Sequence, residues 1–170
     1  MCLQRLAKLG KSNYSLERAR EHYHKLIKNY DNDAEVWALL ARVEKDAWVD
    51  SWRMPGADKT DMQEEAREED ALLRAAIKAY LKAYQLNPAH YYSGINALVL
   101  MHLYQHLTQD LRYAEEMQSL AGAVAFAAAN ESDEYAKFWA LSTLADLDML
   151  TGKPKKVRSA YKEAVARNRK

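Results

Sequence analysis

The stretch AIKAYLKAYQLNP, at residues 76–88, decides the fold of this chain. Ala76 and Ala83 are two helical turns apart, so these small residues share one face and let a neighbouring helix approach closely. Tyr80 stands between them and fills the gap that they leave. Pro88 ends the helix, because proline has no backbone N–H to donate to it. The stretch therefore predicts a helix that packs tightly against another helix.

The same spacing returns elsewhere in the chain. Ala19, Tyr23 and Leu26 stand 57 positions earlier, with leucine in the last place. The turn glycine and second-helix anchors of a final unit are reproduced by Gly152, Val157, Tyr161 and Ala164. This pattern resembles the tetratricopeptide repeat (TPR), a pair of antiparallel helices of about 34 residues. The resemblance implies an all-α, right-handed superhelix of about four helix pairs, which works by presenting a surface.

We expect a single TPR-like domain over residues 1–170. The four predicted pairs are 2–10 with 15–29, 33–51 with 61–86, 90–107 with 109–129, and 132–150 with 153–168. A stack of this kind needs a polar end. The short helix at 2–10 is therefore expected either to be that cap or to continue from further repeats.

An insertion lengthens the second pair, since Tyr23 and Tyr80 are 57 residues apart and a TPR repeats about every 34. It spans residues 49–69, with a Pro55-Gly56 turn at its centre. Its downstream half, residues 61–70, holds six acids and one arginine. One interpretation is a docking strip for a basic partner. The other is the acid-rich start of one long helix, which the helix dipole favours.

Composition and charge exclude several classes of protein. The net charge of +1 gives no overall attraction to nucleic acid or membranes. The longest apolar run, residues 120–129, is about half of a membrane span. Cys2 is the single cysteine, which excludes an internal disulfide framework and a cysteine-based zinc site. Residues 1–11 lack the apolar core of a secretory signal. We expect a cytoplasmic protein without membrane association.

Two further segments carry a structural and a functional interpretation each. The small-residue run at 121–129 predicts close helix packing, with a membrane or dimer face as the alternative. From Lys153 onward, eight lysines or arginines stand against one acid, Glu163. We interpret them as a solvated last helix, with a surface for nucleic acid or an acidic partner as the alternative.

No catalytic pattern is present in the sequence. It contains no glycine-rich phosphate loop and no nucleophile elbow. The many acids adjoin one another on helices expected to be exposed, whereas a catalytic acid needs apolar surroundings. His102 and His106 are four apart and could place two imidazoles on a metal, but no third ligand is fixed. We expect no enzyme, no cofactor and no metal.

Two segments resemble a known family more specifically. Residues 37–52 read WALLARVEKDAWVDSW, and residues 91–96 read YYSGIN. They look like the TRAF-binding domain, the TPR-type central regulatory region of the apoptosis-signal-regulating MAP kinase kinase kinases and its bacterial relatives. The residues that carry the likeness are Ala41, Arg42, Val43, Lys45, Asp46 and Trp48, then Gly94, Ile95 and Asn96, then Phe138, Trp139 and Ala140. Glu44 departs from the family pattern, which has an aromatic there. The resemblance implies a regulatory scaffold that binds protein.

A binding groove is predicted on the concave side of the superhelix. Arg42, Lys45 and Asp46 share one side of the helix at 33–51. On the concave side they would be joined by residues of the next unit's first helix, namely Tyr92, Ile95, Asn96 and Val99. Such a groove suits an acidic or extended peptide. The alternative is an Arg42–Asp46 pair that orients the second unit. Trp37, Trp139 and Tyr161 are predicted to lie in the core.

We therefore predict a non-catalytic protein–protein interaction module, regulatory or scaffolding, that captures a peptide or helix. The candidate contacts are Arg42, Lys45, Asp46, Tyr92, Asn96 and His102. The alternative is a nucleic-acid-linked or enzyme-associated regulator that uses the basic C-terminal helix, although nucleic acid is not the expected partner.

Overall fold

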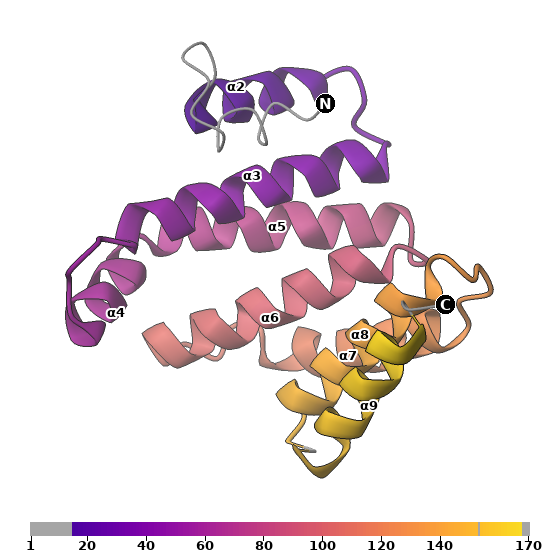
Figure 1. Cartoon of the computed structure of the whole chain (residues 1–170). Helices are drawn as coiled ribbons and strands as arrows, with labels where there is room; N and C mark the ends of the chain where they lie inside the picture. The colour runs from indigo at the N-terminus through magenta and orange to yellow at the C-terminus, as the bar shows by residue number, and fades with distance from the viewer. Residues whose placement is uncertain (1–14, 153, 168–170) are drawn as a thin grey trace.

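The computed structural model describes residues 15–152 and 154–167, and over this part the chain is all-helical. The helices are α2 (Leu16–Leu26), α3 (Ala34–Trp52), α4 (Lys59–Glu68), α5 (Asp70–Leu86), α6 (Tyr91–Thr108), α7 (Ala114–Ala129), α8 (Lys137–Leu150) and α9 (Pro154–Arg167). They stack side by side from α2 to α9 (Figure 1). The predicted all-α, TPR-like solenoid is confirmed. Cys2 and the predicted helix at 2–10 lie outside the described residues.

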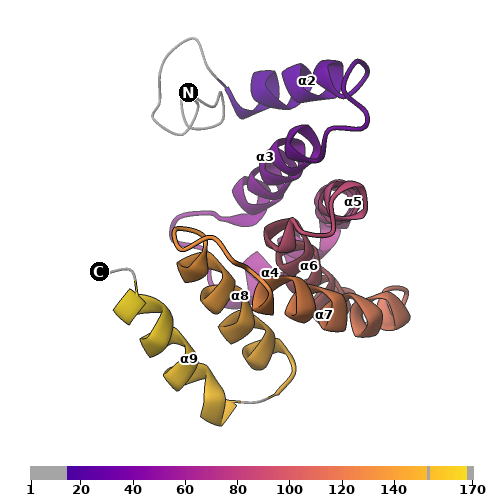
Figure 2. The same cartoon turned by 90° about the vertical axis from the view of Figure 1, so that its right-hand side faces the viewer.

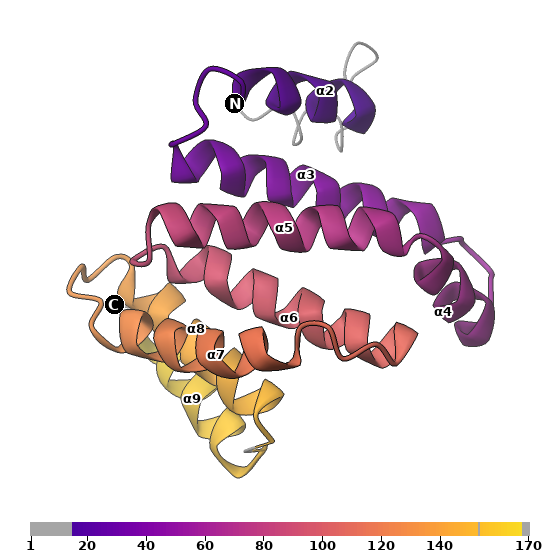
Figure 3. The same ribbon diagram turned by 180° about the vertical axis from the view of Figure 1, so that it is seen from behind.

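The stack bends into an arc. α3, α6 and α8 lie on its inner side, and α5 and α7 lie on its outer side (Figure 2). Seen from behind, α5 and α7 stand in front of α3 and α6 (Figure 3). Among the described helices, the inner side is therefore built from the first helix of the pairs α3–α5, α6–α7 and α8–α9.

Interlocking small and aromatic residues hold α3, α5 and α6 together. Ala76, Tyr80 and Ala83 of α5 are fully buried, as is Ala41 of the facing helix α3. Gly94 of α6 lets α5 and α7 both come close, because a Cβ atom there would lie 3.0 Å from Cδ2 of Tyr84 and 2.3 Å from Cγ2 of Val124. The close packing that the repeat spacing predicts is present in the structure.

The insertion folds differently from the expected long helix at 61–86. The chain forms a separate helix, α4, and begins α5 only after Glu69. The side chain of Asp58 caps α4 by accepting from the amides of Thr60 and Asp61, at 2.7 and 2.9 Å. The indole Nε1 of Trp48 donates to the carbonyl of Ala66 at 3.0 Å, which fastens α4 against α3. The single-helix interpretation of residues 61–86 is therefore wrong.

Several other predictions need correction. Trp139 is not in the core, since 61% of it is exposed. Trp37 and Tyr161 are half-buried, and the Tyr161 hydroxyl donates to Asp146. α7 and α8 begin at Ala114 and Lys137, about five residues later than predicted, after turns in the chain.

The small-residue run of α7 packs on one side only. Val124 and Ala128 are buried, whereas Gly122, Ala123 and Phe126 are exposed. Close packing therefore accounts for half of the run. None of the described helices is long and apolar enough to span a bilayer.

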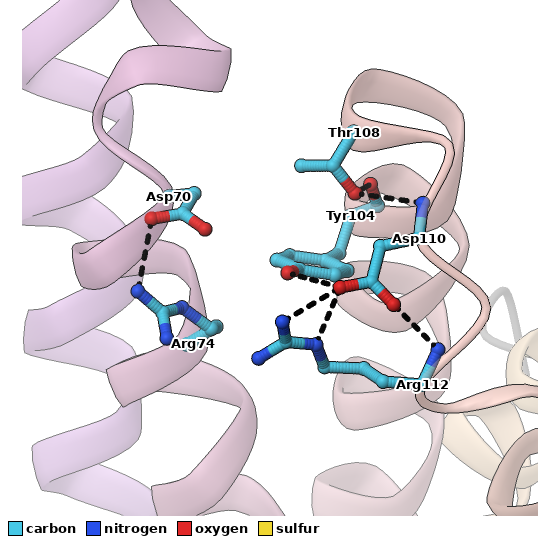
Figure 4. A network of polar contacts seen from close by, with 6 residues as sticks. All are labelled: Asp70, Arg74, Tyr104, Thr108, Asp110 and Arg112. Carbon is cyan, nitrogen blue, oxygen red and sulfur yellow. Dashed lines mark hydrogen bonds and ion pairs between the residues drawn. The ribbon is translucent and has the colours of Figure 1, made fainter.

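A polar network fixes the turn between α6 and α7 (Figure 4). The Asp110 carboxylate accepts from Nε and Nη2 of Arg112, at 2.7 and 2.6 Å, and from the Tyr104 hydroxyl at 3.2 Å. The hydrogen bonds from Arg112 hold the pKa of Asp110 below its usual value. Across from this turn, Arg74 of α5 pairs with Asp70 at 3.0 Å. The network fixes the direction in which α7 leaves α6.

A buried carboxylate joins α2 to α3. Glu44 is 1% exposed, and its two oxygens accept from Nε of Arg20 at 2.7 Å and pair with Nε2 of His24 at 2.8 Å. A buried carboxylate needs such partners because leaving it unpaired is costly. The polar residue that departs from the TRAF-binding-domain pattern thus makes a specific contact with α2.

Candidate functional site

A hollow of about 470 Å³ opens on the inner side of the arc. Its walls come from α3, α4 and α6, with one residue from α8. The residues that line it are Lys45, Trp48, Val49, Trp52, Lys59, Met62, Gln63, Ala66, Ile95, Asn96, Val99, Leu100, Leu103, His106, Leu107 and Asp146. We call this set the inner hollow. Its volume lies within the range of about 300–1,000 Å³ typical of ligand pockets.

Helical spacing places the mostly apolar residues that line the inner hollow on facing sides of α3 and α6. Lys45, Val49 and Trp52 recur every three or four residues along α3, which places them on one face. The same spacing brings Val99 and Leu103 of α6 to the opposite wall. The third wall is α4, which is held in place by the bond from Trp48 to Ala66. The insertion thus contributes a side of the hollow that a plain repeat pair lacks.

Polar groups join α3 to α6 at one edge of the hollow. Nζ of Lys45 donates to Oδ1 of Asn96 at 3.0 Å and lies 5.7 Å from the centre of the Tyr80 ring. Asn96 in turn donates from Nδ2 to the carbonyl of Tyr92 at 2.8 Å. This chain of contacts orients two of the predicted site residues toward each other across the groove.

The sequence-predicted residues do not all reach the hollow. Lys45 and Asn96 line it, and Arg42 and Tyr92 lie about one turn earlier on the same two helices. Asp46 is buried, with 8% of its surface exposed. His102 is half-buried and is not among the lining residues.

Three of these residues influence the buried side chain of Tyr80. Burial raises the pKa of Tyr80, and the neighbouring Tyr92 and Asp46 raise it further, whereas Arg42 lowers it. The Tyr80 and Tyr92 rings meet edge to face at 6.2 Å. Tyr92 therefore packs against Tyr80, and the charges of Arg42 and Asp46 act on the buried Tyr80 hydroxyl. Burial also lowers the pKa of His102.

Sequence reasoning missed much of the lining. Trp48 and Trp52 of α3 carried a signal, since they share a face with Lys45 at helical spacing. Met62 and Gln63 of α4 carried none, because their place depends on how the insertion folds back. His106 lines the hollow in place of His102.

One family model agrees with this architecture. The family described as Tetratricopeptide Repeats-Sensor (TPR-S) matches residues 1–101. The chain belongs to the TPR-S family. No curated protein and no solved structure shows a significant match to the chain.

The TPR-S match places most of the inner hollow within the family's own region. It includes all of α3 and α4 and the first part of α6, whereas Leu103, His106, Leu107 and Asp146 follow it. TPR-type domains generally mediate protein–protein interactions and are generally non-catalytic. Within residues 15–152 and 154–167, no three His, Cys, Asp or Glu side chains gather to hold a metal ion.

Proposed function

We propose that this TPR-S chain is a regulatory or scaffolding module that captures a segment of a partner protein in the inner hollow. The observation that carries the proposal is the hollow itself, which combines apolar walls with a few polar groups at its edge. Such a composition favours burial of a partner's large apolar side chain, while the polar groups set its orientation.

Exposed apolar side chains around the hollow support the same role. Leu103, within the hollow, is 38% exposed, and Tyr92, about one turn before Asn96, is 39% exposed. Large apolar groups that gather near a concave surface are typical of a protein-binding site. The likeness of residues 37–52 and 91–96 to the TRAF-binding domain points to the same kind of role, regulation by binding protein.

The proposal is tested by selecting binders from a random peptide display library on the purified chain. Selected peptides should lose at least about tenfold in affinity to a Leu103→Asp variant, because a carboxylate in the apolar wall opposes burial of an apolar side chain. Leu103 is partly exposed, so the variant should keep its fold, which circular dichroism checks.

The matched control is Leu111→Asp. Leu111 is 64% exposed and lies in the turn between α6 and α7, outside the inner hollow. This variant should bind the selected peptides as well as the unchanged chain does. Equal loss in both variants, or a library that yields no peptide sensitive to Leu103→Asp, contradicts the proposed function.

A further inference from the structure

We infer that the segment captured is an acidic amphipathic helix that contacts the inner side of the arc at two apolar points. This inference rests on the proposed function and adds the conformation, charge and length of the partner segment. Four features of the inner side support it.

The first feature is the length and apolar character of the inner hollow. Its α6 wall runs from Ile95 to Leu107, which is about 18 Å at 1.5 Å per residue. The side chains along it are largely apolar, so they cannot pair the backbone N–H and C=O groups of an extended segment. A helix pairs these groups internally, and an unpaired buried backbone group is costly. The inner hollow therefore favours a partner helix of about twelve residues.

The second feature is charge. Lys45 and Lys59 line the hollow from α3 and α4. Beyond the lining, the cation of Arg42 is offset by the buried acid Asp46 on the same helix. The lining also includes the acid Asp146, whose carboxylate accepts from the Tyr161 hydroxyl of α9. Cations thus exceed acids along the hollow, which complements carboxylates on the partner.

The third feature is a second apolar point on α8. Trp139 stands seven residues, about two turns, before Asp146, so the two residues share one face of α8. Because Asp146 lines the hollow, this face is turned toward the inner side. Trp139 is 61% exposed there, so its large aromatic surface is available to a partner.

The fourth feature is the distance between the two points. The Tyr91 hydroxyl donates to the carbonyl of Ala136 at 3.3 Å, which brings the start of α6 beside the start of α8. Trp139 therefore lies near the Tyr92 end of the groove, and Leu103 lies at the hollow. Tyr92 and Leu103 are eleven residues apart on α6, or about 16 Å. Two apolar residues about eleven positions apart on a partner helix lie on one face and match this spacing.

The experiment uses two labelled alanine-based helical peptides and fluorescence anisotropy. The acidic probe carries leucine and tryptophan eleven positions apart, with two glutamates between them on the same face. The basic probe is identical except that lysines replace the glutamates. The acidic probe should bind with a Kd at least about tenfold lower than that of the basic probe, and Lys45→Glu with Lys59→Glu should reverse this preference.

Two variants test the apolar points, and one serves as the charge control. Trp139→Ser and Leu103→Asp should each weaken the acidic probe by about tenfold or more. Lys156→Glu, at an exposed lysine of α9, should leave the preference unchanged.

The outcomes separate this inference from the proposed function. Equal binding of the two probes, a preference for the basic probe, or indifference to Trp139→Ser overturns the inference. Display-selected peptides that need Leu103 but gain no helical circular dichroism on binding also overturn it, while the proposed function stands. A dimer of this chain that Leu103→Asp dissociates would assign the surface to a second copy and overturn the inference as well.

Discussion

Replacing Gly94 by alanine is the sharpest test of how closely the helices pack. Gly94 lies on α6 where α5 and α7 both approach. An added Cβ would lie 2.3 Å from Cγ2 of Val124 and 3.0 Å from Cδ2 of Tyr84. Real Cβ atoms do not approach that closely, so a neighbour must move. Overpacking of this kind costs about 1–3 kcal/mol.

Helix propensity acts in the opposite direction. Alanine is better than glycine in a helix interior by about 1 kcal/mol. The steric cost exceeds this gain, because Val124 is fully buried and has little room to shift. We therefore expect Gly94→Ala to lower the free energy of unfolding by up to about 2 kcal/mol, measured by urea denaturation at 25 °C.

Gly122→Ala is the matched control. Gly122 lies within α7, and an added Cβ there would meet nothing within 4 Å. The same chemical change should raise stability by about 0.5–1 kcal/mol. In the double variant Gly94→Ala with Val124→Ala, the clashing Cγ2 is gone. The combined loss should fall short of the sum of the single losses by about 1 kcal/mol. If Gly94→Ala is as stabilising as Gly122→Ala, the close approach of α6 and α7 is wrong.

Three further predictions concern single residues. Glu44→Gln should lower the free energy of unfolding by about 1–2 kcal/mol, because Arg20 and His24 lose a charged partner. Amide hydrogen exchange should become faster in α2 than in α5. Equal exchange rates in both helices would argue against this contact. Gln109 ends α6 with φ at 59°, a left-handed backbone conformation that glycine adopts more easily. Gln109→Gly should therefore raise the free energy of unfolding by about 0.5–1 kcal/mol in the same urea assay. A loss of stability would show that the glutamine side chain contributes more than the backbone strain costs. Burial lowers the pKa of His102 from its ordinary 6.5, so the folded state binds fewer protons than the unfolded state does. The stability that comes from burying a neutral His102 is fully present above pH 6.5 and is lost as the pH falls below that value. In urea denaturation from pH 7.5 to 5.5, the free energy of unfolding should therefore fall less steeply with pH in His102→Gln than in the unchanged chain. An equal fall in both would assign the pH dependence to other groups.

The spacing of residues predicted the repeat architecture because helix packing depends on local geometry. Ala76, Tyr80 and Ala83 share one face whatever the partner is, and each is fully buried. Pro88 sets the end of α5 by its missing N–H, and α5 ends two residues before it. Such signals are read within two or three turns of one helix, so they need no knowledge of the rest of the chain.

The candidate site could be predicted only in part. Lys45 and Asn96 were expected on one groove, and they meet there at 3.0 Å. Their helical spacing gave the face, and the repeat order gave the neighbouring helix. Trp139 was misplaced because an aromatic residue beside small ones suits a core face as well as an open groove.

By itself, the sequence determined that the chain is a stack of paired helices with a concave side, because residue size and periodicity fix which faces pack. Only the tertiary structure decided that the insertion folds into a separate helix, fastened by Trp48 to Ala66, and walls off the inner hollow. It also decided that Trp139 remains exposed and that Glu44 is buried against α2. These outcomes depend on contacts between residues far apart in the chain, which no local spacing encodes.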